Sequence, residues 1–127
     1  MNKVIISTQD APAAIGAYSQ AVKVGGQVYV SGQIPLVPET GDLVSDDFSL
    51  QAKQVFDNLS AVAKAAESDL NNVVKLTVYL IDLNHFAELN KIMSEYMTEP
   101  YPARAAVEVS ALPMGAQLEI DAILCVG

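Results

Sequence analysis

The spacing of apolar residues changes several times along this chain, and these changes decide which folds are open to it. Apolar residues at every second position predict strands, whereas apolar residues three or four positions apart predict two helices. From the N terminus, the predicted elements are a strand at 3–6, hairpin strands at 20–24 and 27–30, a helix at 49–66, a strand at 73–80, a helix that begins after Asn84 and ends before Pro100, and strands at 104–109 and 117–126.

Local signals refine several of these elements. The Gly-Gly pair at 25–26, between two alternating runs, is typical of a tight hairpin turn of the primed type. Asn84 is expected to cap the second helix. In the strand at 73–80, the alternation is expected to place Val74 on the same face as Leu76. The last strand alternates most regularly, and its apolar face is formed by Leu118, Ile120, Ala122, Leu124 and Val126.

Together these elements predict an α+β fold with a mixed β-sheet of five to six strands and two helices packed on one face. The chain has 127 residues, so residues 1–127 are expected to form a single domain. The second face of the sheet would leave Tyr79, Ile123 and Cys125 without cover. Because no further helix is predicted, we expect a partner subunit to cover that face.

Charge and composition exclude several classes of function. The chain has 7 basic and 15 acidic residues, a formal net charge of −8, and no basic run, so nucleic acid binding is not expected. The single cysteine excludes an intrachain disulfide and offers no zinc-binding spacing, and it suits a reducing compartment. No signal peptide or membrane-spanning run is recognisable, so a soluble, cytoplasmic protein without membrane contact is expected.

Few residues are candidates for chemistry. His85, the only histidine, is expected to be a solvated surface residue, and Cys125 lies in a strand of the buried type, where a thiol is usually inert. Arg104 and Glu119 are charged residues within otherwise apolar strands. Their spacing is compatible with a surface ion pair or with two solvated side chains. It is also compatible with a guanidinium that binds a substrate carboxylate and a carboxylate that acts on a water molecule.

Several motifs resemble one known family over nearly the whole chain. They are Gly-Ala-Tyr-Ser-Gln-Ala at 16–21, Ser-Gly-Gln-Ile-Pro at 31–35, Pro-Glu-Thr-Gly at 38–41, Pro-Ala-Arg at 102–104, and Leu-Pro-Met-Gly-Ala-Gln-Leu-Glu-Ile-Asp-Ala-Ile at 112–123. In order and spacing they resemble the RidA/YjgF family of reactive-intermediate deaminases. The resemblance implies a fold similar to the small trimeric chorismate mutases, with active sites between the subunits of a homotrimer. It also implies hydrolysis of 2-imino acids, such as 2-iminobutanoate and 2-iminopropanoate, to 2-keto acids and ammonia, without a cofactor or metal.

The resemblance assigns roles to five residues of this chain. Arg104 would bind the substrate carboxylate, and Glu119 would hold the attacking water and accept its proton. Tyr18 would bind substrate and assist proton transfer. Ser31 and Gly32 would contact the substrate through their backbone, which the substrate can approach closely because Gly32 has no side chain.

The chain departs from the usual family pattern at two positions. Ala17 replaces a frequent proline before the tyrosine, and Ala106 replaces a frequent cysteine, so no thiol at that position can be essential here. Asn90 matches a recurrent helix asparagine, without an expected chemical role. The alternatives left open are a non-catalytic binding protein for 2-keto acids or related carboxylates, a deaminase of another substrate such as 2-aminomuconate, and a ribonuclease, against which the net charge argues.

Overall fold

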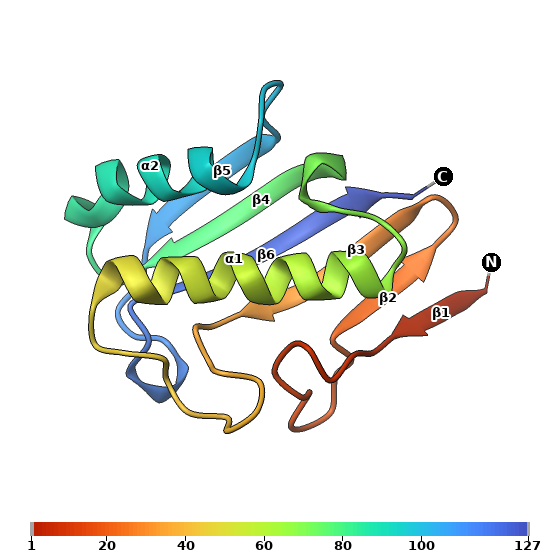
Figure 1. Cartoon of the computed structure of the whole chain (residues 1–127), viewed down its shortest axis with the longest axis horizontal. Helices are drawn as coiled ribbons and strands as arrows, with labels where there is room; N and C mark the ends of the chain where they lie inside the picture. Colours follow the sequence, from red (N-terminus) through yellow and green to blue (C-terminus); the bar gives the residue numbers. More distant parts are fainter. Residues whose placement is uncertain (1, 127) are drawn as a thin grey trace.

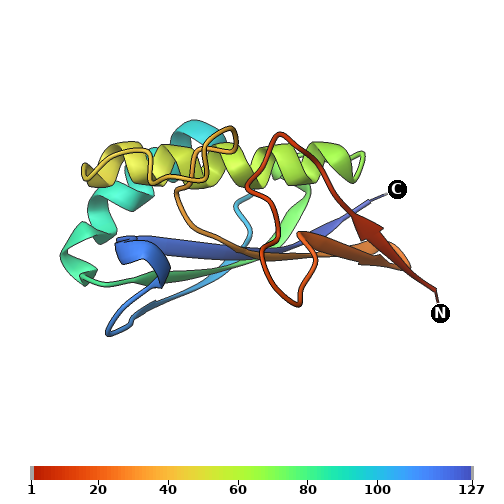
Figure 2. The same cartoon turned by 90° about the horizontal axis from the view of Figure 1, so that it is seen from below.

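A computed structural model describes residues 2–126 as a six-stranded mixed sheet with two helices on one of its faces (Figures 1 and 2). The α+β fold class and this arrangement of layers are as predicted. The strands are β1 (Lys3–Ile6), β2 (Ala21–Val24), β3 (Gln27–Gln33), β4 (Val73–Leu80), β5 (Ala103–Glu108) and β6 (Leu118–Cys125), and the helices are α1 (Phe48–Ala65) and α2 (Phe86–Tyr96). Single 3-10 turns, η1 (Leu70–Asn72), η2 (Leu83–His85) and η3 (Pro113–Gly115), precede β4, α2 and β6.

The strands lie in the order β1-β2-β3-β6-β4-β5, which places the last strand of the chain in the middle of the sheet. Strand β6 pairs antiparallel with both β3 and β4. Strands β4 and β5 are parallel, because α2 crosses over between them. Strand β6 therefore lies between the hairpin and β4.

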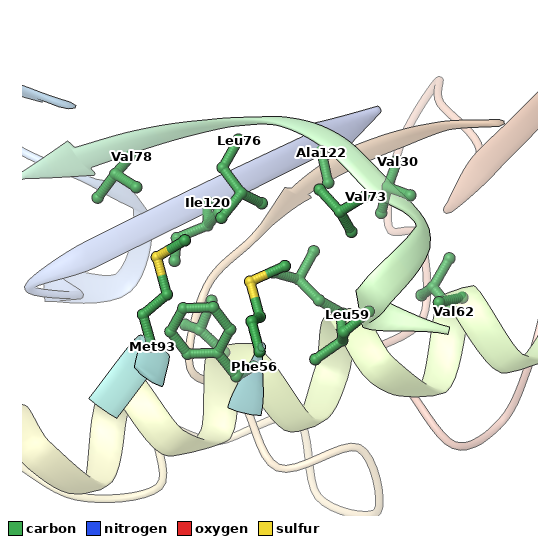
Figure 3. Packing of buried hydrophobic residues seen from close by; sticks show 14 of the residues in the cluster. Val30, Phe56, Leu59, Val62, Val73, Leu76, Val78, Met93, Ile120 and Ala122 are labelled. Atoms are coloured by element: carbon green, nitrogen blue, oxygen red, sulfur yellow. The ribbon is translucent and has the colours of Figure 1, made fainter. Parts of the chain in front are cut away.

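The hydrophobic core lies between the helices and the sheet (Figure 3). Phe56 and Leu59 of α1 point toward the sheet, and Ile120 of β6 points toward them. The alternation of β6 is as predicted: its buried residues are Leu118, Ile120, Ala122 and Leu124. Neither helix among residues 2–126 has the length and apolar character that a bilayer span requires.

The hairpin prediction is also confirmed. Strands β2 and β3 pair antiparallel around residues 25–26. Gly25 has a φ of 61°, in the left-handed region that primed hairpin turns require and that glycine adopts without strain.

The prediction that Asn84 caps the second helix is wrong. Asp82 accepts a hydrogen bond from the Asn84 N–H at 2.9 Å and so caps η2, which runs directly into α2. His85 occupies the cap position of α2 without a side-chain hydrogen bond. The physical reason is that a 3-10 turn precedes the helix, so the free N–H groups begin earlier in the chain and are capped by an aspartate two residues before Asn84.

The predicted face of Val74 is also wrong. Val74 is 42% exposed, whereas Val73 is 6% exposed and packs in the core. The pairing of β4 with β6 shifts between Val73 and Lys75. A β-bulge of this kind adds one residue to a strand and reverses the faces of the residues before it, which the alternation alone does not reveal.

The face of the sheet opposite the helices carries no helix (Figure 2). Val107 and Tyr29 are 44% and 46% exposed on this open face, and Ile123 and Tyr79 are half-buried there. Cys125 is exposed on this uncovered face, where the alternation of the last strand placed it, and it is not buried packing. It follows Leu124 at the end of β6 and therefore points to the open face rather than to the helices.

Candidate functional site

Glu119 lies on the open face of the sheet because of its position in β6. Its neighbours Leu118 and Ile120 are buried beneath the helices, so the pleat turns Glu119 to the other side. In the register of the sheet it pairs with Tyr79 of β4. Its side chain is half-buried although no helix covers it.

A bulge in β3 brings the Ser-Gly pair against this glutamate. Val30 pairs with Ala122 and Gln33 with Ile120, so the register shifts across Ser31 and Gly32. A Cβ atom added to Gly32 would lie 2.8 Å from Cδ and 3.1 Å from Cγ of Glu119. Only glycine fits at this position, because the carboxyl group of Glu119 occupies the space that a side chain would need.

The loop that carries Tyr18 is held to the sheet by one buried amide. The Gln20 side chain accepts from the Thr8 N–H at 2.7 Å. Its amide nitrogen donates to the carbonyl oxygens of Thr8, Ala11 and Pro12 at 3.0, 3.3 and 2.8 Å. Buried polar groups with several good partners fix local geometry, so the segment before Tyr18 has a defined course.

Ser31 contributes to the same arrangement. Its hydroxyl donates to the Ser19 carbonyl at 2.6 Å, and its N–H donates to the Gln20 carbonyl at 2.9 Å. The hydroxyl proton of Ser31 is therefore engaged in holding the residue that follows Tyr18. The Tyr18 hydroxyl accepts a longer hydrogen bond, 3.4 Å, from the Ile15 N–H.

These residues surround a cavity of about 400 Å³, which we call the Glu119 cavity. It brings together four of the five residues predicted for the site. Its walls are formed by Tyr18, Ser31, Gly32, Ile34, Pro113 and Glu119.

Arg104 lies elsewhere, on the helix face of the sheet. It pairs with buried Leu76 in the register of β4 and β5, and it points toward α2. Its Nη1 donates to Asn90 Oδ1 at 2.5 Å, and its guanidinium carbon lies 4.8 Å from the centre of the Phe86 ring. Nη1 is also 3.7 Å from the sulfur of Met93.

These contacts hold the guanidinium in one place beside a second cavity, of about 350 Å³, which we call the Arg104 cavity. Met93, Tyr101 and Pro102 give this cavity apolar walls, and Asn90 and Ser94 add polar groups. The sequence singled out Asn90 without a role, and it gave no signal for Phe86 beyond its helical spacing. A cation stacked on an aromatic ring and hydrogen-bonded to an amide is preorganised for an anionic ligand.

The sheet therefore separates Arg104 from Glu119 within one chain. Arg104 shares the helix face with Leu76, whereas Glu119 shares the open face with Tyr79. The structure brings together Tyr18, Ser31, Gly32 and Glu119 but does not bring Arg104 to them.

The carboxyl group of Glu119 lies in an environment that favours its protonated form. Burial is the main cause that raises its pKa above the ordinary range of glutamate, and the negative charge of Asp121 on the same face raises it further. The Tyr79 hydroxyl donates to Asp121 Oδ2 at 3.0 Å, and this hydrogen bond is the first cause of a raised pKa of Tyr79. A carboxylate with a raised pKa is a stronger base at neutral pH, which suits a group that removes a proton from water.

The other candidates do not form a site. His85 is less solvated than predicted, because its ring stacks on Phe48 with centroids 4.1 Å apart and lies 3.4 Å from the Glu88 carboxylate. Within residues 2–126, no group of three or more histidine, cysteine, aspartate or glutamate side chains is arranged to hold a metal ion.

Comparison with known proteins identifies a matching family, similar sequences and a similar solved structure. The profile of the family described as endoribonuclease L-PSP matches residues 8–126. The chain is 52% identical to a RutC family protein of Pyrococcus abyssi over 97% of both chains. It is 50% identical to the 2-iminobutanoate/2-iminopropanoate deaminase of Mus musculus, over 97% of this chain and 91% of the relative. The crystal structure of RidA from the Antarctic bacterium Psychrobacter sp. PAMC 21119 superposes with a TM-score of 0.94 at 53% identity, over 97% of this chain and 99% of that one.

Replacing Asp121 by asparagine is expected to lower the pKa of Glu119. The substitution removes a negative charge that opposes ionisation but keeps an oxygen that accepts from Tyr79. Titration of the Glu119 carboxyl carbon by NMR should give a pKa above about 4.3, the ordinary value, in the wild type and a lower one in Asp121→Asn. Asp57→Asn, on the exposed side of α1, is the matched control and should leave the titration unchanged. An ordinary wild-type pKa, or a rise in Asp121→Asn, would contradict this electrostatic assignment.

Proposed function

This chain belongs to the RidA/YjgF family, and from that premise we propose that it hydrolyses reactive 2-imino acids to 2-keto acids and ammonia. The observation that carries the proposal is the Glu119 carboxyl group, which has a raised pKa and lies against Gly32 on the wall of a cavity open to ligands. The naming of a mouse relative as a 2-iminobutanoate/2-iminopropanoate deaminase supports this reaction, and those two imines are the first substrates to test.

Arg104 is the proposed carboxylate-binding residue. Its guanidinium is already fixed by Asn90 and Phe86, so little conformational entropy is lost when a ligand binds. The planar guanidinium can donate two parallel hydrogen bonds to a carboxylate, which lysine cannot do. The charge also gives an acidic protein a local attraction for an anionic substrate.

Because the sheet separates Arg104 from Glu119, we propose that each active site takes these residues from two copies of the chain. In this arrangement β5 of one copy, at the edge of the sheet, carries Arg104 to the Glu119 cavity of the next copy. A homotrimer with three such sites follows the resemblance, and the exposed Val107 and Tyr29 on the open face support burial between copies.

The proposed reaction needs only proton transfer and addition of water. Glu119 accepts a proton from a water molecule as the water oxygen bonds to the imine carbon. Glu119 then passes this proton to the nitrogen of the resulting tetrahedral adduct, with the Tyr18 hydroxyl placed to assist. The carbon–nitrogen bond then breaks, and loss of the hydroxyl proton leaves a 2-keto acid and ammonia. Imines react readily with water, so positioning supplies a large part of the acceleration.

Binding of 2-keto acids without turnover is the second candidate function. The preorganised Arg104 favours it as much as it favours the hydrolase, because a carboxylate is present in both ligands. A raised Glu119 pKa is needed mainly for catalysis. Nuclease activity, which the description of the family suggests, is disfavoured by 15 acidic against 7 basic residues.

The substitution Glu119→Gln is expected to abolish turnover and to keep ligand binding. Glutamine can still hydrogen-bond a water molecule but cannot accept its proton. In an assay coupled to threonine dehydratase and threonine, imine hydrolysis should fall by roughly 10²–10⁴-fold. Calorimetry should show that 2-oxobutanoate still binds, whereas Arg104→Ala, and to a lesser degree Arg104→Lys, should weaken its binding. If the wild type does not accelerate imine loss but binds the keto acid, the binding function is correct and the hydrolase is not.

The substitution Gly32→Ala is expected to keep the fold and to reduce turnover. The new methyl group would displace the flexible end of the Glu119 side chain rather than any backbone atom. A displacement of about 1 Å at a reacting group costs on the order of 10²-fold in rate. Gly26→Ala is the control, because its Cβ would meet the Val126 carbonyl oxygen at an ordinary 3.5 Å. Wild-type turnover in a folded Gly32→Ala protein would show that the position of Glu119 does not limit the reaction.

A further inference from the structure

A second cavity adjoins the Glu119 cavity and shares part of its wall. Its volume is about 280 Å³, and Tyr18, Gly32, Ile34 and Pro113 line both cavities. Its other residues are the apolar Pro12, Ala13, Ile15, Leu36 and Met114 and two buried glutamines, Gln20 and Gln33, whose amide groups donate to backbone carbonyl oxygens. The compartment that contains the reactive carboxyl group therefore opens beside one that is lined mainly by apolar residues, which we call the side-chain pocket.

The rim of the side-chain pocket exposes two large apolar residues. Ile15 is 83% exposed and Met114 is 57% exposed. Met114 also has a φ of 59°, a left-handed conformation that side chains other than glycine rarely adopt. The turn η3 holds this conformation between Pro113 and Gly115. Strain and exposed apolar surface at the mouth of a site are both typical of ligand binding.

The chemistry of the substrate indicates what this pocket holds. The imine carbon carries three groups: the nitrogen, the carboxylate and the side chain of the parent amino acid. In the proposed reaction, Arg104 holds the carboxylate and Glu119 directs water to the imine carbon. The side chain is left to enter the adjoining space, and a methyl or ethyl group would leave most of 280 Å³ unfilled.

We propose that the side-chain pocket binds the side chain of the substrate and makes this protein selective for 2-imino acids with long apolar side chains, with Ile15 and Met114 as specificity-determining residues. This inference rests on the proposed hydrolase function and names its substrate class. Each additional methylene group in an apolar pocket is worth roughly tenfold or more in kcat/KM. A butyl side chain has three more methylene groups than a methyl side chain, and full contact of only one of them with the pocket would give a preference of at least about tenfold.

The test compares imines that differ only in side-chain length. D-amino-acid oxidase, with catalase present, releases the imines of D-alanine and D-norleucine, and semicarbazide traps whatever imine remains. For the wild type, kcat/KM should be at least about tenfold higher for the norleucine-derived imine. Ile15→Ala and Met114→Ala should each reduce this ratio by about threefold or more, because they remove apolar contact from the longer side chain. Leu50→Ala, at an exposed leucine of α1 that lines neither cavity, should leave both rates unchanged.

Calorimetry with pyruvate and 2-oxohexanoate tests the pocket without turnover. The longer keto acid should bind more tightly to the wild type, and the difference should shrink in Ile15→Ala and Met114→Ala. Two results would contradict the proposed role of the pocket without contradicting the hydrolase function. One is hydrolysis of both imines without a preference for the longer one. The other is an equal loss of kcat/KM for both imines in the two variants. Tighter binding of 2-oxohexanoate without hydrolysis of either imine would support the pocket and overturn the hydrolase.

Discussion

The pleat of the β-sheet is the constraint on which the rest of this structure depends. Successive side chains in a strand point to opposite faces, and paired residues on neighbouring strands point to the same face. Arg104 is therefore fixed on the helix face beside Leu76, and Glu119 is fixed on the open face beside Tyr79. No rotamer change brings these two side chains together in one chain, so a site that uses both requires a second copy.

Each half of the proposed site is stabilised independently. On the open face, the β3 bulge, the Gln20 amide and the Ser31 hydroxyl together fix Tyr18 beside Glu119. On the helix face, α2 fixes Arg104 through an amide and an aromatic ring. The core between α1, α2 and β6 connects the two halves, because β6 carries Glu119 on one side and core residues on the other. The proposed assembly would then bring together two halves that are already formed within each chain.

Periodicity predicted the elements well because most strands and both helices bury one regular face. It failed where the backbone departs from regular geometry. At the bulge in β4, Val73 rather than Val74 is buried. At the 3-10 turn before α2, Asp82 rather than Asn84 is the capping residue. Alternation placed Cys125 on the uncovered face correctly, whereas the inference that a strand of the buried type also buries this thiol was wrong.

The residues of the candidate site were predicted from the family resemblance, whereas their separation by the sheet was not. That separation depends on strand order and register, which sequence patterns did not supply. The same limit applies to the hydrogen bond of Tyr79 with Asp121, whose two residues lie 42 positions apart in the chain. A side-chain contact between neighbouring strands can be predicted only when the pairing and register of those strands are known.

Complementation between two inactive variants tests most directly whether each site is shared between copies. Arg104→Ala and Glu119→Gln chains are co-expressed with different affinity tags, and assemblies that contain both are isolated. In a trimer that contains both chains, about a third of the sites would receive a wild-type Arg104 from one chain and a wild-type Glu119 from the next. These mixed assemblies are expected to recover imine hydrolysis at about that fraction of the wild-type rate, whereas each variant alone stays inactive. Mixed assemblies that form but remain as inactive as the separate variants would contradict it.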